Sequence, residues 1–204
     1  MLNQPIELAA LVRAVAFRLL VTHGEPIAHE RLAEATGVST GRLALVVGQQ
    51  DNAGRIRRDP AGRVVGSAGL SVIADRHQID LEGRRFWTWC AYDILGIFGA
   101  LSGSGHAVSP SPPDRDMIEV RFAWGRPQQS DAVLFRPDAE LMDSCQNVYQ
   151  EWCPNSNLFA RREMAEAWAS KHRISGSVLS LDEAADLATD DWKPLTQGLV
   201  LNKE

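Results

Sequence analysis

The sequence predicts an α+β protein in which an N-terminal winged-helix-like three-helix unit precedes a mixed or antiparallel sheet with flanking helices. In the first 50 residues, apolar residues recur at three- and four-residue steps, as they do in helices. Further along, short apolar runs alternate with turns rich in proline and glycine, as between strands. The 204 residues, 45% hydrophobic and 23% charged, suffice for one sizeable core of an ordinary soluble protein.

The N-terminal unit is predicted from three helical patterns followed by a hairpin. The first helix carries apolar residues from Leu8 to Leu20 on one face and ends before Gly24. A second helix near 29–36 is closed by Gly37, and a third runs over about 39–49. The turn at 59–62, Asp-Pro-Ala-Gly, separates two short alternating runs. Three helices and a hairpin make a winged-helix pattern, so we assign residues 1–75 to this unit and residues 76–204 to a second domain.

Winged helices read DNA in some proteins and serve as packing modules in others. The expected wing is basic, with Arg55, Arg57, Arg58 and Arg63. The expected recognition helix, however, offers only Arg42 with Gln49 and Gln50, and the net charge is -5. The sequence therefore argues against nucleic acid as a partner and favours a packing role.

The second domain is predicted to mix strands and helices. Strand patterns occur at 77–80, 106–109, 117–123, 132–135 and 178–179. Helical patterns occur at 87–101 and 160–172, and Ser180-Leu181-Asp182-Glu183 is a capping box that opens a last helix. The stretch 136–157 reads as irregular.

The sequence also indicates a compartment. The N-terminus lacks a basic segment followed by an apolar one, and the longest apolar stretch, 86–101, is broken by Asp93 and too short to span a bilayer. The three cysteines are Cys90, Cys145 and Cys153; their number is odd, and no pair has CxxC spacing. We therefore expect free thiols, a cytoplasmic protein and no membrane partner.

The segment Cys90-Ala91-Tyr92-Asp93 places a thiol and a carboxylate in an apolar run. Helical spacing would put both on one face, about one turn apart. Burial of a carboxylate raises its pKa, which suits the group to hold and then release a proton. In the alternative interpretation, Asp93 satisfies a neighbouring backbone group and Cys90 fills space.

Two separated motifs resemble those of the organomercurial (alkylmercury) lyase family. Residues 89–95, Trp-Cys-Ala-Tyr-Asp-Ile-Leu, resemble the motif W-C-A-x-D-x-L, which carries the first catalytic cysteine and the catalytic aspartate. Trp152-Cys153 and a helix containing Ala165-Glu166-Ala167-Trp168 and Lys171-His172 resemble the second motif. The resemblance covers most of the chain and implies that Cys90, Asp93 and Cys153 are catalytic.

The reaction that the resemblance implies is protonolysis of a carbon–mercury bond. Two cysteine thiolates bind the mercury of a small organomercurial, since soft metals prefer sulfur. Asp93 takes up a thiol proton and delivers it to the leaving carbon, so a hydrocarbon departs and Hg(II) remains on the thiols. External small thiols or a partner mercuric reductase then remove Hg(II), and no bound cofactor is expected. Trp87, Trp89, Tyr92 and Trp152 either line an apolar pocket for the organic group or are simply core residues.

Departures from the family pattern keep two alternatives open. Pro154 follows Cys153 where many members have another cysteine, and residues 109–113 lack a further expected cysteine. Cys145 matches no family position; it is either a structural or surface thiol or a transfer thiol. The first alternative is a family member repurposed for another small-molecule reaction or for soft-metal binding. The second is a winged-helix metal sensor that uses the three thiols.

Overall fold

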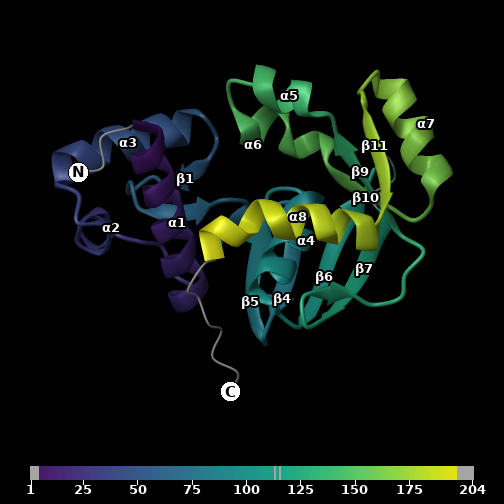
Figure 1. Ribbon diagram of the computed structural model, residues 1–204, viewed down its shortest axis with the longest axis horizontal. Coiled ribbons are helices and arrows are strands. Elements are labelled where there is room, and N and C mark those ends of the chain that lie inside the picture. The colour runs from purple at the N-terminus through teal and green to yellow at the C-terminus, as the bar shows by residue number, and fades with distance from the viewer. Residues whose placement is uncertain (1–4, 113, 115, 197–204) are drawn as a thin grey trace.

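The computed structural model describes residues 5–112, 114 and 116–196 of the chain. Figure 1 shows a helical N-terminal group beside a larger body of sheet and helices, with helix α8 lying across the front of that body. The N-terminal group comprises α1 (Pro5–His23), α2 (His29–Thr36), α3 (Thr40–Asn52), β1 (Ile56–Arg58) and β2 (Val64–Ser67). The three helices and the hairpin are as predicted, and the winged-helix class of this group stays an expectation.

An antiparallel sheet runs from the N-terminal group into the larger body. Its strand order is β1-β2-β3-β5-β4-β6-β7-β8, and the paired strands in it are antiparallel. The further strands are β3 (Leu70–Ser71), β4 (His77–Leu81), β5 (Arg84–Thr88), β6 (Gly105–Ser111), β7 (Asp116–Ala123) and β8 (Arg126–Pro127). Hydrogen bonding therefore continues across residue 75, where we placed the domain boundary.

A second, three-stranded antiparallel sheet has the order β10-β9-β11. It is formed by β9 (Val133–Pro137), β10 (Asn157–Phe159) and β11 (Gly176–Ser180). The helices of the larger body are α4 (Ala91–Leu101), α5 (Ala139–Ser144), α6 (Val148–Glu151), α7 (Arg162–His172) and α8 (Leu181–Thr196), with a 3-10 turn at Cys153–Asn155. Ser180 and Glu183 exchange the hydrogen bonds of the predicted capping box at the start of α8.

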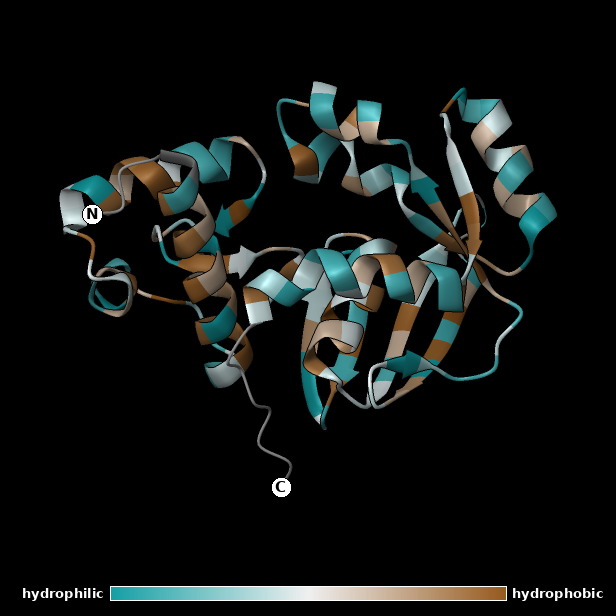
Figure 2. Cartoon of the chain, viewed as in Figure 1, coloured by the Kyte–Doolittle hydropathy of each residue, from teal (hydrophilic) through white to brown (hydrophobic). Residues whose placement is uncertain are grey.

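Helix α4 is the buried centre of the larger body, and α8 packs directly on it. A Cβ atom on Gly96 would lie 2.5 Å from the ring of Trp192, so the absence of a side chain allows the close approach of α8. Figure 2 shows hydrophobic residues gathered along α1 and the strands of the sheet. No helix in the described part of the chain is long and apolar enough to cross a membrane.

Two predictions for the second half were wrong in detail. The predicted helix 87–101 begins only at Ala91, because Phe86, Trp87 and Thr88 pair as the end of strand β5. Aromatic and β-branched residues favour strands, which explains this boundary. The stretch 136–157, predicted to be irregular, contains the short helices α5 and α6 and the 3-10 turn.

Candidate active site

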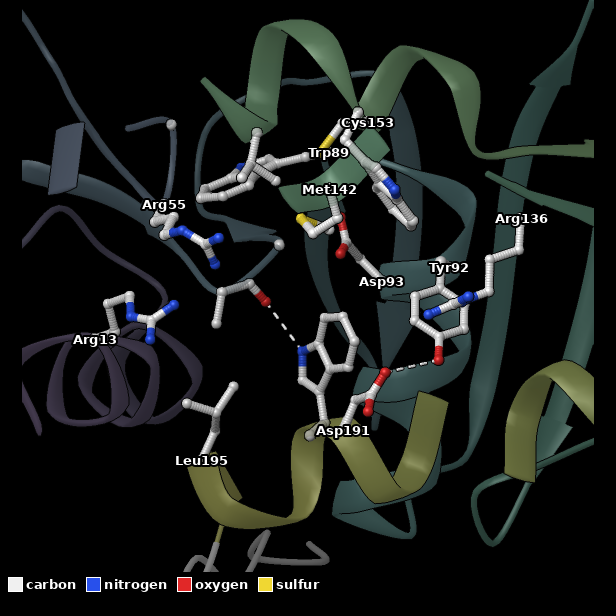
Figure 3. Close-up of a pocket in the computed structure, with 16 residues that line it drawn as sticks. Arg13, Arg55, Trp89, Tyr92, Asp93, Arg136, Met142, Cys153, Asp191 and Leu195 are labelled. Carbon is white, nitrogen blue, oxygen red and sulfur yellow. Dashed lines mark hydrogen bonds between the residues drawn. The ribbon is translucent and has the colours of Figure 1, made fainter. Parts of the chain in front are cut away.

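Cys90, Asp93 and Cys153 meet in the interior of the molecule. Their nearest ligand atoms, two sulfurs and a carboxylate oxygen, all lie within 4.8 Å of one another, and all three residues are buried. Cys90 immediately precedes α4, Asp93 lies in the first turn of α4, and Cys153 begins the 3-10 turn after α6. Figure 3 shows Asp93 and Cys153 beside a pocket whose walls come from several segments distant in sequence.

The local geometry of Cys90 and Asp93 differs from the predicted pairing on one helix face. Cys90 has an extended backbone and is the N-cap of α4, and Asp93 is the third residue of the helix. The Cys90 N–H donates to Asp93 Oδ2 at 2.8 Å, and the Asp93 N–H donates to the Cys90 sulfur. This is a capping box with cysteine in the usual place of serine or threonine. Asp93 thus satisfies a backbone group and also lies in the cluster.

The hydrogen bonds at the start of α4 also hold the Cys153 segment in place. The first N–H groups of a helix have no partner within the helix. Here the Ala91 N–H donates to the Ser156 carbonyl oxygen at 3.1 Å, and the Tyr92 N–H donates to Ser156 Oγ at 3.3 Å. Because Ser156 follows Cys153 by three residues, this contact brings the second cysteine to the first.

The turn between β2 and β3 forms the third side of the cluster. Ala68 and Gly69 both have positive φ angles, 49° and 84°, as in a two-residue hairpin turn. A Cβ atom on Gly69 would lie 2.3 Å from Asp93 Cγ, so only glycine fits both the turn and the carboxylate. The Gly69 carbonyl oxygen accepts a hydrogen bond from the Trp89 N–H at 3.0 Å, next to Cys90.

Arg76 links the two segments that carry the cysteines. Its guanidinium group donates to the carbonyl oxygen of Trp89 at 2.9 Å and to that of Tyr149 at 3.0 Å. Trp89 precedes Cys90, and Tyr149 lies on α6, the helix before Cys153. The same guanidinium lies over the Tyr149 ring, 4.3 Å from its centroid, which adds a cation–π contact. A single charged side chain therefore fixes the spacing of both segments.

Burial sets the protonation of the cluster. It raises the pKa of Asp93 to about 7, although hydrogen bonds from Cys90 and the charge of Arg76 act in the opposite direction. Burial also raises the pKa of Cys90 well above its usual value, together with the hydrogen bond to Cys153 and the charge of Asp93. The resting site thus holds a neutral Cys90 thiol beside a carboxyl group that binds and releases a proton near neutral pH.

A cavity of about 290 Å³ opens beside the cluster, with Asp93 and Cys153 in its wall. Its apolar lining includes Trp89, Tyr92, Met142, Val148, Trp152, Trp192 and Leu195. Trp87, which we also expected in this wall, is not among the lining residues. Side chains alternate along a strand, and its neighbours Phe86 and Thr88 on β5 are the buried ones, so Trp87 points to the other face.

Several polar residues of the pocket were not predicted from the sequence. Arg13 on α1, Arg55 before β1 and Arg136 on β9 all reach it. The Tyr92 hydroxyl donates a hydrogen bond of 2.8 Å to Asp191, which lies on α8. The Arg136 guanidinium lies over the Tyr92 ring, 5.0 Å from its centroid. No sequence motif marks these residues, because four separate segments bring them together.

Cys145 lies outside the cluster of three. It follows α5, is half-buried, and its thiol donates to the Met142 carbonyl oxygen at 3.3 Å. Burial and the charge of Glu151 raise the pKa of this thiol. Its surroundings thus favour the protonated form, and its role as a structural or transfer thiol stays an expectation.

Three of the four wing arginines have acidic partners. Arg57 pairs with Asp75, Arg58 with Asp51 at 2.7 Å, and Arg63 with Asp59 at 2.7 Å. The fourth, Arg55, lines the pocket. Carboxylates of the protein itself therefore neutralise most of the positive charge of these arginines.

Comparison with known proteins identifies the family. Residues 70–192 match the family model described as alkylmercury lyase. An alkylmercury lyase of Pseudomonas putida is 32% identical over 180 residues, which cover 83% of this chain and 77% of that protein. One of Streptomyces lividans is 26% identical over 187 residues, covering 89% and 80%.

The fold agrees with this result. A solved structure, described as the mercury-bound form of MerB2, superimposes with a TM-score of 0.81 at 24% sequence identity and covers 95% of this chain and 93% of that one. The matched sequence segment contains the cysteine and aspartate cluster together with most of the pocket. The chain belongs to the alkylmercury lyase family.

Proposed function

We propose that the protein cleaves the carbon–mercury bond of small organomercurials by protonolysis. The observation that carries this proposal is the buried cluster of Cys90, Asp93 and Cys153, whose ligand atoms lie within 4.8 Å of one another beside a largely apolar pocket. Two sulfurs suit a soft metal such as mercury, and a carboxyl with a pKa near 7 suits proton transfer. Membership of the alkylmercury lyase family supports the same reaction.

The reaction begins at the cysteine that the substrate reaches first. Cys153 and Asp93 line the pocket, whereas Cys90 lies behind them with no exposed surface. The Cys153 sulfur therefore bonds to the mercury of R–Hg–X, while X departs with the proton of that thiol. The Cys90 thiol then gives its proton to Asp93 and bonds to the mercury through the freed electron pair.

Asp93 completes the cleavage. Its carboxyl group donates the proton to the carbon bonded to mercury, and the electrons of the carbon–mercury bond form the new carbon–hydrogen bond. R–H leaves, and Hg(II) remains bonded to two cysteine sulfurs. In total, one organomercurial R–Hg–X and two thiols give one hydrocarbon R–H, one HX and a neutral mercury dithiolate. Proton transfer and exchange of mercury ligands therefore account for the whole reaction.

The pocket suits an alkyl or aryl group. An apolar cavity of roughly 150 Å³ accepts benzene in another protein, and this cavity of about 290 Å³ is larger. Trp152 and Trp192 both pack edge-on against Tyr92, with ring centroids 6.0 and 5.7 Å apart, which makes that wall rigid. The apolar wall excludes water while the proton is transferred to carbon.

Hydrocarbon release tests the proposal directly. Reduced protein is incubated with phenylmercury or methylmercury and excess small thiol, and benzene or methane is followed by gas chromatography. Cys90→Ser and Cys153→Ser should each abolish release, and Cys145→Ser is the matched control because that thiol lies outside the cluster. Release that persists without either cluster cysteine contradicts the mechanism, and no release from the wild type contradicts the function.

A further inference from the structure

Three arginines line the pocket, and none of them forms an ion pair with the described residues. Arg136 lies over the Tyr92 ring, whereas Arg13 and Arg55 lie together at the other side of the cavity. Arg13 comes from α1 and Arg55 from the residue before β1, and both line the cavity that contains Cys153. Within the described residues, no ion pair involves either guanidinium group, and Arg13 Nε is buried without a hydrogen-bond partner. A buried donor without an acceptor costs free energy, so this end of the pocket is prepared for an acceptor that the protein itself does not supply.

The two guanidinium groups act on each other. Burial and the nearby charge of Arg55 both lower the pKa of Arg13. Arginine nevertheless keeps its charge in proteins, so the pair is held together against repulsion. Figure 3 shows Arg13 and Arg55 side by side, apart from Asp191 and Tyr92. A negative charge placed between the two arginines would relieve their repulsion and satisfy their donors.

The other charged groups of the pocket do not neutralise this pair. The lining carboxylates are those of Asp93, which is buried in the cluster, and Asp191, which accepts a hydrogen bond from the Tyr92 hydroxyl. The protein as a whole carries a net charge of -5, so general attraction of anions does not explain a local positive site. The pair is thus a local feature of the pocket.

We infer that Arg13 and Arg55 form a carboxylate-binding subsite that recruits an acidic small thiol to the mercury held by Cys90 and Cys153. This inference rests on the proposed function, which leaves Hg(II) as a dithiolate that needs external thiols for release. Because both arginines line the same cavity as Cys153, a thiol whose carboxylate they bind would enter that cavity with its sulfur. Fixed in this way, it attacks mercury at a raised effective concentration.

The exchange balances without any further reagent. The incoming sulfur forms a bond to mercury as the bond from mercury to Cys153 breaks, and the Cys153 sulfur keeps the electron pair and takes the proton of the incoming thiol. A second thiol displaces Cys90 in the same way. The products are Hg(SR)₂ and the two reduced cysteines.

The test follows mercury release separately from carbon–mercury cleavage. Protein loaded with one equivalent of Hg(II) is mixed with 3-mercaptopropanoate or with neutral 2-mercaptoethanol, and loss of protein-bound mercury is timed. For each protein, the rate with 3-mercaptopropanoate is divided by the rate with 2-mercaptoethanol. When this ratio is compared between wild type and variants, the difference in intrinsic reactivity between the two thiols cancels. Loss of hydrogen bonds to a charged group corresponds to roughly tenfold or more, so this ratio should fall about tenfold in Arg13→Gln and Arg55→Gln.

Controls keep the outcomes distinct. Arg58→Gln removes an arginine of the same hairpin that is paired with Asp51, and it should leave the ratio unchanged. Propanoate, which has the carboxylate but no thiol, should slow release by 3-mercaptopropanoate in the wild type and leave release by 2-mercaptoethanol unaffected. This last arm needs no variant, so a folding defect in Arg13→Gln does not remove the test.

A further experiment asks whether the two arginines bind a carboxylate on the thiol or a carboxylate on the organic group of the substrate. Cleavage of 4-carboxyphenylmercury is compared with that of phenylmercury at a saturating neutral thiol. An equal effect of Arg55→Gln on both supports recruitment of the thiol, whereas a selective loss with the carboxylated substrate reassigns the subsite to the substrate. Equal rate ratios in wild type and variants, without competition by propanoate, overturn the inference. Failure of the wild type to hold Hg(II) overturns the proposed function itself.

Discussion

The buried carboxyl of Asp93 should make the stability of the protein depend on pH in a definite direction. Its pKa is about 7 in the folded protein against 3.8 in the absence of burial. Between these values, the folded chain holds a proton that the unfolded chain has released. Stability rises with pH only where the unfolded state binds more protons, so the contribution of Asp93 falls as pH rises from about 4 to about 7.

The size of this effect follows from the two pKa values. A difference of one in pKa corresponds to about 1.4 kcal/mol, so the full cost of ionising Asp93 in the folded protein is roughly 4 kcal/mol above pH 7. Most of it develops between pH 5 and pH 8, where the same relation gives about 2 to 3 kcal/mol. Asp93 is only 5% exposed, so solvent screening does not reduce the figure greatly.

Asp93→Asn isolates this contribution, since the amide oxygen can still accept the hydrogen bond of the Cys90 N–H while the side chain no longer ionises. Stability is measured by urea unfolding of reduced protein at pH 5 and at pH 8. The stability of the variant relative to wild type should increase by about 2 to 3 kcal/mol between these pH values, or about 5 to 10 °C in melting temperature for a chain of this size.

Asp131→Asn, at an exposed position before β9, measures the background effect of removing one surface carboxylate. A difference between Asp93→Asn and wild type that is the same at pH 5 and pH 8 would refute the assignment of a raised pKa to Asp93. Asp93→Asn should still bind Hg(II) through Cys90 and Cys153, and it should release no benzene from phenylmercury.

Further variants test the elements around the cluster. Gly69→Ala should lower benzene release at least tenfold and cost roughly 1 to 3 kcal/mol in urea unfolding, because its Cβ would collide with Asp93 at a positive φ; unchanged release would contradict the packing. Arg76→Gln should cost roughly 2 to 3 kcal/mol, since it leaves two partly buried carbonyl groups without their charged donor, and a loss below about 0.5 kcal/mol would contradict its linking role. Ser156→Ala should cost about 1 kcal/mol and weaken retention of Hg(II) against competing thiols, because it removes one bond that holds Cys153 near α4. Cys145→Ser should keep most of the hydrocarbon release, and complete loss would show that the thiol outside the cluster is essential.

The sequence predicted most elements of the fold because their patterns are local. The periodic apolar face of α1, the turn at 59–62 and the capping box of α8 each depend on a few neighbouring residues, and each was found in its place. The start of α4 was misplaced because the apolar run 86–101 suits both a buried strand and a buried helix. Only pairing with β4 and β3 decides that residues 84–88 belong to the sheet.

In the candidate site, too, the sequence indicated relations between neighbouring residues and missed those that only the fold creates. Cys90 and Asp93 are neighbours in sequence, so their relation was visible, although the extended backbone at Cys90 turns it into a capping box. Cys153 could be joined to them only through the family resemblance, because sequence spacing does not show that Ser156 docks on α4. Arg76 gave no signal at all, since its partners are backbone carbonyl groups.

The backbone N–H groups at the start of α4 also position the three residues of the candidate site. The three N–H groups at the start of α4 need acceptors, and they obtain them from the Cys90 sulfur and from two oxygens of Ser156. These contacts place the second cysteine beside the first and the carboxyl of Asp93 between the helix and the turn at Gly69. Because folding itself brings the three groups within 4.8 Å, substrate binding need not order them. In the proposed reaction, the substrate would then have only to fill the apolar pocket and exchange its ligand for a cysteine sulfur.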